Sequence, residues 1–68
     1  MKYAIIELQR VSGGDLAHLY TTKDTLPEAK AEFYRVMSAV AVSGIDAHSV
    51  ILSDEDGNVL RVGNNKDE

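Results

Sequence analysis

The sequence predicts an α+β fold in which two β-hairpins flank one long helix, in the order ββαββ. Residues 25–44 carry a helix start signal, an apolar stripe at helical spacing and a final glycine. Apolar runs of strand length stand before and after this stretch, and a glycine-containing turn separates the two runs of each pair. We therefore expect one domain over residues 1–63, followed by a polar tail at 64–68. Its four-stranded antiparallel sheet should have the order 2-1-3-4, with the helix packed across one face.

The first hairpin is predicted from residues 2–11 and 16–22, which alternate between apolar and polar with an apolar excess. Between them, Gly13 and Gly14 suit a two-residue turn, because glycine tolerates the positive φ angles that such turns need. This register places Leu8 opposite Leu19. It also places on one face Tyr3, Ile5, Val11, Leu16 and Tyr20, with Glu7, Gln9 and His18 among them, so that neither face is clearly polar.

The helix is predicted over residues 26–43. Thr25 can cap its first turn, Glu28 completes a capping-box spacing, and Pro27 lies where a missing N–H has no cost. Gly44 offers the residue of positive φ that often follows a helix. Residues 36–42 are apolar or small on every side, so we expect a second surface to cover what the sheet leaves open. The core stripe consists of Leu26, Ala29, Phe33, Val36 or Met37, and Val40.

The second hairpin is predicted from residues 47–53 and 58–62, joined by a type I turn with Gly57 in the left-handed conformation. Its register pairs Leu52 with Leu60 and Val50 with Val62, which collects four apolar side chains on one face. The carboxylates at 54–56 give this turn a superficial likeness to a calcium loop. An EF-hand spreads its ligands over about twelve residues, so turn formation explains the acidic residues better.

A chain of 68 residues is close to the size at which a single hydrophobic core gives only marginal stability. Cysteine is absent, which excludes disulfides and thiolate metal sites. Two histidines, His18 and His48, are too few for an all-histidine metal site, although carboxylates could complete one. Oligomerisation is the remaining means of stabilisation, and we expect a two-fold homodimer.

The charge pattern argues against nucleic acid as a partner. The formal net charge is −4, and the 7 Lys and Arg residues are scattered along the chain, whereas binding to a phosphate backbone needs clustered positive charge. No apolar run approaches the roughly 18 residues that span a bilayer. The start MKYAIIELQR also lacks the apolar segment and cleavage site of a signal peptide. We therefore expect a cytoplasmic protein without membrane contact.

No catalytic or ligand-binding motif stands out in the sequence. His48 could act as a general base or an anion contact, but we expect an edge histidine satisfied by a backbone carbonyl. The serines at 38, 43, 49 and 53 have no base partner at a fixed spacing. We expect no enzyme activity, no metal and no cofactor.

Two sets of residues are candidates for contacts with other molecules. Tyrosine is enriched in interfaces because it combines apolar area with one polar end. The interface candidates are Tyr3, Ile5, Leu16, Tyr20, Met37 and Val42. The candidates for ligand contact, if they converge on one pocket, are His48, Tyr34, Arg35 and Arg61.

Three segments resemble a group of short proteins carried by phages and prophages of gut Firmicutes. They are KYAIIELQ at 2–9, FYRVMSAVAVS at 33–43 and HSVIL at 48–52. The resemblance covers most of the chain, but it is carried by hydrophobic and small residues, and the polar end after Val62 departs from it. That group has no established activity. The resemblance therefore implies a context only, a small accessory protein of a phage or mobile element.

Three hypotheses of function follow. The first is a non-enzymatic, homodimeric protein-interaction module whose exposed sheet face or dimer groove binds another protein, such as a host factor or a virion component. The alternative is a protein that sequesters a nucleotide or another metabolite at the dimer seam. The third is an enzyme that uses His48 as a base.

Overall fold

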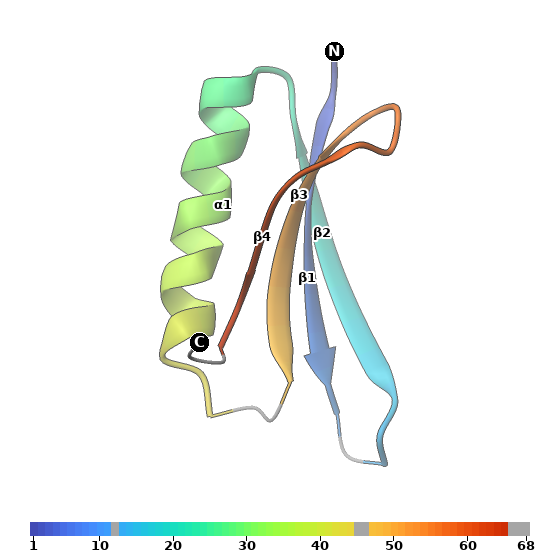
Figure 1. The fold of residues 1–68 in the computed structure, drawn as a ribbon, viewed down its shortest axis with the longest axis vertical. Coiled ribbons are helices and arrows are strands. Elements are labelled where there is room, and N and C mark those ends of the chain that lie inside the picture. Colours follow the sequence, from blue (N-terminus) through green and yellow to red (C-terminus); the bar gives the residue numbers. More distant parts are fainter. Residues whose placement is uncertain (12, 45–46, 66–68) are drawn as a thin grey trace.

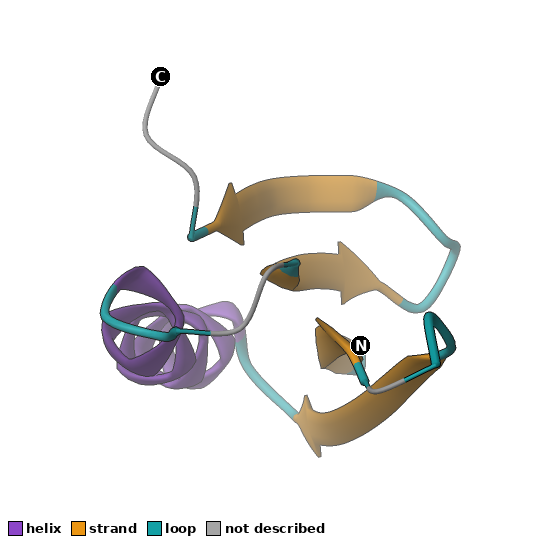
Figure 2. Cartoon of the chain, turned by 90° about the horizontal axis from the view of Figure 1, so that it is seen from below, coloured by secondary structure: helices purple, strands orange, loops and turns teal. Residues whose placement is uncertain are grey.

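The computed structural model describes residues 1–11, 13–44 and 47–65 and has the predicted ββαββ order (Figure 1). Its strands form one antiparallel sheet in the order β2-β1-β3-β4, and the helix packs against one face of that sheet (Figure 2). The predicted fold class is confirmed. The elements are β1 (Tyr3–Arg10), β2 (Leu16–Lys23), α1 (Leu26–Ala41), β3 (His48–Asp54) and β4 (Val59–Asn64).

Both ends of α1 can be explained by hydrogen bonds. The hydroxyl of Thr25 accepts a bond from the backbone N–H of Glu28 at 3.4 Å and donates to its carboxylate at 2.9 Å, so the predicted N-cap is confirmed. At the other end, the N–H of Ser43 donates to the carbonyl of Val40 at 3.1 Å. This 3₁₀-type bond closes the last turn without a left-handed residue. The predicted positive φ at Gly44 and the predicted end at residue 43 are therefore wrong.

The core lies between α1 and the two central strands, β1 and β3. Leu26 and Met37 of the helix, with Tyr3 of β1, pack against its margin. β2 stands at the edge of the sheet and is exposed along almost its whole length. No helix in the described part of the chain has the length and apolar character needed to cross a membrane. The buried apolar residues are Ile5, Ala29, Phe33, Val36, Val40, Val50 and Leu52.

The predicted register of the first hairpin is wrong by one residue. Leu8 pairs with His18 rather than with Leu19. The N–H of Val11 donates to the carbonyl of Asp15 at 2.9 Å, so the loop holds three residues instead of two. Gly13 and Gly14 have the positive φ angles that the turn needs, and Ser12 lies outside the described residues.

This slip changes which side chains share a face, because successive side chains of a strand point to opposite sides. Ile5 faces α1 and is buried in the core. Leu16 and Tyr20 instead share the opposite face with Ile6. The predicted face that combined Tyr3 and Ile5 with Leu16 and Tyr20 does not exist.

A β-bulge shifts the second hairpin. Next to the turn, Ser53 pairs with Val59 as predicted, but Leu52 then pairs with Arg61, so Leu60 is the extra residue of the bulge. The predicted pairing of Leu52 with Leu60 is therefore wrong, as is that of Val50 with Val62. Arg61 comes to the helix side of the sheet, and Val62, opposite Ile51, comes to the other side.

Candidate functional site

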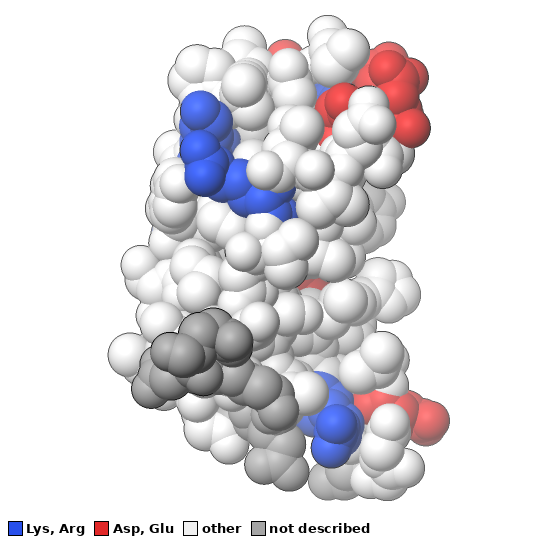
Figure 3. All heavy atoms as spheres, viewed as in Figure 1, with Lys and Arg blue, Asp and Glu red and all other residues white. Residues whose placement is uncertain are grey.

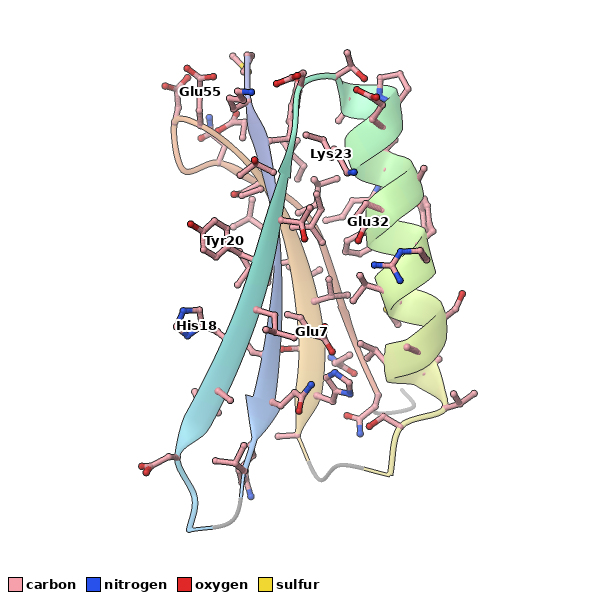
Figure 4. All side chains as sticks on the ribbon, turned by 180° about the vertical axis from the view of Figure 1, so that it is seen from behind. Glu7, His18, Tyr20, Lys23, Glu32 and Glu55 are labelled. Atoms are coloured by element: carbon pink, nitrogen blue, oxygen red, sulfur yellow. The ribbon has the colours of Figure 1, made fainter. Side chains whose placement is uncertain are left out.

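The sheet face away from α1 is apolar along its middle and uncovered; we call it the open face. A cross-strand row runs over all four strands, with each residue directly opposite the next, in the order Tyr20, Ile6, Ile51 and Val62. Figure 4 shows Tyr20 and His18 pointing away from the helix. The flanking rows contain Thr22, Ala4, Ser53 and Val59 on one side and His18, Leu8, Ser49 and Asn64 on the other.

A second feature is a polar cluster under the far end of α1. His48 is only 6% exposed, and its Nε2 lies 2.5 Å from Oε2 of Glu7. The side-chain amide of Gln9 also donates to Glu7 Oε2, at 3.2 Å. Nδ1 of His48 is buried and has no hydrogen-bond partner among the described residues. Packing therefore closes this imidazole off from solvent, and a carboxylate occupies its other nitrogen.

A third feature is a groove between α1 and β4, with a volume of about 330 Å³. The guanidinium of Arg61 lies over the ring of Tyr34, 5.9 Å from its centroid. That ring in turn meets Phe33 edge to face, with centroids 5.3 Å apart. Figure 3 shows basic side chains over the upper part of α1 and the adjoining strand, while acidic side chains gather at the β3–β4 turn. The groove is lined by Phe33, Tyr34, Met37, Leu60, Arg61, Val62 and Gly63.

The four predicted ligand contacts do not converge on one pocket. Tyr34 and Arg61 meet in the groove, but His48 belongs to the polar cluster. Arg35 forms an ion pair with Glu32, which raises the pKa of Arg35 and lowers that of Glu32. Arg35 lines a smaller hollow beside β2.

The six predicted interface residues also divide. Ile5 is buried in the core, and Tyr3 and Met37 pack against the core. Leu16, Tyr20 and Val42 are exposed. Ile6, Ile51 and Val62 were not among the predicted interface residues. The slipped register had placed the side chains of β2 on the wrong face, and the unforeseen bulge exchanged the faces of Arg61 and Val62.

The acidic turn forms as expected. Oδ1 of Asp54 accepts the backbone N–H groups of Asp56 and Asn58, both at 2.9 Å, and Oδ2 accepts the side-chain amide of Asn58 at 3.0 Å. These bonds, with the amide of Asn58 first, lower the pKa of Asp54. Gly57 has a φ of 87°, as the predicted turn requires. Across the described ranges, no group of three or more potential ligands could hold a metal ion.

Comparisons with known proteins gave no match, either to a protein-family model, to a curated protein or to a solved structure. The open face and the groove are therefore the features from which a function can be inferred.

Proposed function

We propose that this chain is a non-enzymatic protein-interaction module that forms a homodimer through its open face. The observation that supports this proposal is the apolar row from Tyr20 to Val62. These two end residues are 68% and 62% exposed, and both lie on edge strands where no part of α1 can reach them. A contiguous exposed apolar patch on a protein of this size usually marks an interface.

The size of the open face is close to the lower limit for a stable contact with a second copy of this chain. Four strands about 4.8 Å apart and about seven residues long cover roughly 19 by 23 Å, or about 440 Å² of projected area. Two stacked sheets would therefore bury about 900 Å² of projected area in total. The accessible surface is larger than the projected area, because the side chains make the face uneven. Stable interfaces begin at about 1,200 Å² of accessible surface, which a corrugated face of this extent approaches.

The charges of the open face also favour self-association. Its three rows contain no Asp, Glu, Lys or Arg, although the chain as a whole has a net charge of −4. Two copies can therefore stack these rows without bringing like charges into contact, with Arg10, which pairs with Leu16 on the same face, beyond one end of the rows.

The non-enzymatic part of the proposal is supported by His48. The imidazole is buried and paired with Glu7, so a substrate could not reach it without local opening of the helix. Its role is better explained by structure than by general base catalysis. A protein target of the dimer, such as a host or virion protein in a phage context, stays a prediction.

The test is the mass in solution, measured by light scattering over a concentration series. Wild-type protein should be a dimer, and Tyr20→Glu should be a monomer because it places a charge within the apolar row. Leu19→Glu is the matched control: Leu19 neighbours Tyr20 on the same strand and is 65% exposed, but its side chain belongs to the other face. This variant should remain a dimer.

Two outcomes would contradict the proposal. A wild-type monomer at all concentrations up to about 1 mM would show that the open face does not bind a copy of itself. A dimer that Leu19→Glu disrupts as strongly as Tyr20→Glu would place the interface elsewhere. Circular dichroism confirms in each case that the variants are folded.

A further inference from the structure

We propose that the groove between α1 and β4 binds a small organic anion with a flat apolar body. In this proposal, Arg61 binds the acidic group and the side chains of Tyr34 and Met37 hold the body. The groove opens on the helix side of the sheet and meets the open face at Val62, which belongs to both surfaces. This inference does not depend on the proposed dimer, because Arg61, Tyr34 and Met37 are not part of the open face.

Arg61 has the free donors that such a site needs. Within the described ranges, Lys2 and Arg35 each have a carboxylate partner, but Arg61 has none. Its Cζ lies over the ring of Tyr34, 5.9 Å from the ring centroid. No hydrogen bond to a described residue occupies the N–H groups of Arg61, and their fork matches the two oxygens of a carboxylate.

The bulge in β4 is what brings Arg61 to the groove. Without the extra residue Leu60, Arg61 would lie opposite Ile51 and point from the open face. With it, Arg61 lies opposite Leu52, on the side of α1. Bulges are common next to functional sites because they redirect a side chain in this way.

Gly63 shapes the floor of the same groove. A Cβ atom at this position would overlap Sδ of Met37 and stand 3.0 Å from its Cε. The missing side chain therefore lets Met37 lie flat against the strand. Methionine is flexible and polarisable, so it adapts well to the face of a flat ring.

The dimensions of the groove limit the ligand. Its volume of about 330 Å³ is at the lower end of the range for small-molecule sites, about 300–1,000 Å³. Apart from Arg61 and the hydroxyl of Tyr34, its walls are built mainly by apolar side chains, among them Phe33 and Leu60. A compact aromatic acid fits this combination of a single cation and apolar walls.

The test is a titration followed by ¹H–¹⁵N NMR spectroscopy, with indole-3-acetate as the probe and uncharged indole-3-acetamide as its control. The acid should cause saturable shifts at residues 33–37 and 60–63, and the amide should bind about tenfold more weakly or worse, since charge-assisted hydrogen bonds are the stronger ones. Arg61→Gln should weaken binding of the acid by a similar factor. The matched control, Arg35→Gln, removes the same charge from the neighbouring hollow and should change the affinity less than twofold.

A second variant tests the shape of the site. Gly63→Ala keeps Arg61 but displaces Met37, so binding of indole-3-acetate should weaken. The proposal is overturned by equal affinities for acid and amide, by shifts confined to the open face, or by no saturable shift up to about 20 mM probe. Unchanged binding by Arg61→Gln would overturn it as well. The Tyr20→Glu variant should still bind indole-3-acetate in the groove. Loss of the dimer and loss of ligand binding can therefore be distinguished.

Discussion

Nε2 of His48 and Oε2 of Glu7 lie 2.5 Å apart on the sheet face that α1 covers, and they join the first residue of β3 to the middle of β1. The contact places a polar pair at the margin of a core that is otherwise apolar. A buried imidazole needs such a partner, because it has lost the water that would otherwise bind it.

Removing one member of this pair should destabilise the fold. Glu7→Ala leaves a buried nitrogen of His48 unpaired, so we expect a loss of about 1–3 kcal/mol in the free energy of unfolding, measured in urea. The double variant Glu7→Leu/His48→Leu should cost less than the sum of Glu7→Leu and His48→Leu measured separately, because replacing both partners removes the buried imidazole that Glu7→Leu alone would leave without its carboxylate. Additive losses would mean that the two side chains are not coupled.

The close approach of Gly63 to Met37 gives a second prediction. Gly63→Ala should reduce the free energy of unfolding by no more than about 1 kcal/mol, because the new methyl group overlaps the thioether of Met37, which is the flexible end of that side chain and can move aside. Adding Met37→Ala should recover part of that loss. Gly44→Ala is the control: apart from its chain neighbours, no atom of the described residues lies within 4 Å of its added Cβ, and its φ is not positive. Urea unfolding should show Gly44→Ala to be neutral or slightly stabilising.

The helix cap gives a third prediction. Thr25→Ala removes the oxygen that accepts the N–H of Glu28 and should cost about 1 kcal/mol in the free energy of unfolding. Thr25→Ser keeps this oxygen and serves as the control. Thermal unfolding followed by circular dichroism compares the two variants, and an equal loss in both would assign the effect to packing of the threonine methyl group.

The pKa of Asp54 determines the sign of a fourth prediction. Hydrogen bonds from Asn58 and Asp56 lower this pKa in the folded state below its ordinary value of 3.8. The stabilisation is therefore fully present above about pH 4 and is lost as the pH falls through the folded-state pKa. The pKa of Glu32, beside Arg35, shifts in the same direction.

The melting temperature of wild-type protein should consequently fall between about pH 4 and pH 2. The melting temperature of Asp54→Ala should fall less over this range, because the variant lacks the carboxylate whose hydrogen bonds are weakened by protonation. If the melting temperature of Asp54→Ala depends on pH as strongly as that of wild type, Asp54 does not contribute to the acid sensitivity.

A fifth prediction concerns salt and the proposed dimer. Each chain has a net charge of −4 while the open face has no charged side chain in its rows. Salt should screen the general repulsion between copies and leave the apolar contact intact. Sedimentation equilibrium should therefore show tighter association at about 500 mM than at about 50 mM NaCl. Weaker association would mean that ion pairs hold the dimer.

The elements and their order could be predicted because local signals marked them: the Thr25 cap, the apolar stripe of the helix and the glycine turns. The register of the first hairpin could not. Two adjacent glycines suit a two-residue or a three-residue loop, and both faces of β1 are apolar, with Ile5 on one side and Ile6 on the other. Packing against α1 decides which of the two faces is buried and therefore which register forms. This packing cannot be read from the sequence.

Two residues of the groove could be predicted from the sequence, but their contact could not. Tyr34 and Arg61 were named as candidates for ligand contact, but they meet only because of the bulge. Leu60 and Val62 are both apolar, so the sequence is compatible with β4 pairing either with or without the bulge. Gly63 was the available signal, since a glycine inside a strand often marks a bulge. For Arg35, the signal that could have identified its partner was the three-residue spacing to Glu32 on the helix, which favours an ion pair.

The position of β1 between β2 and β3 has a consequence for how the chain folds. Each hairpin joins residues that are close in the sequence, but the central pairing joins Tyr3 to Asp54, near opposite ends of the chain. The loop that this contact closes contains β2 and the whole of α1, so it carries the largest loss of chain entropy in the sheet. Contacts of such range slow folding relative to local ones. The seam between β1 and β3 should thus be the last part of the sheet to form, although it lies at the centre of the finished fold.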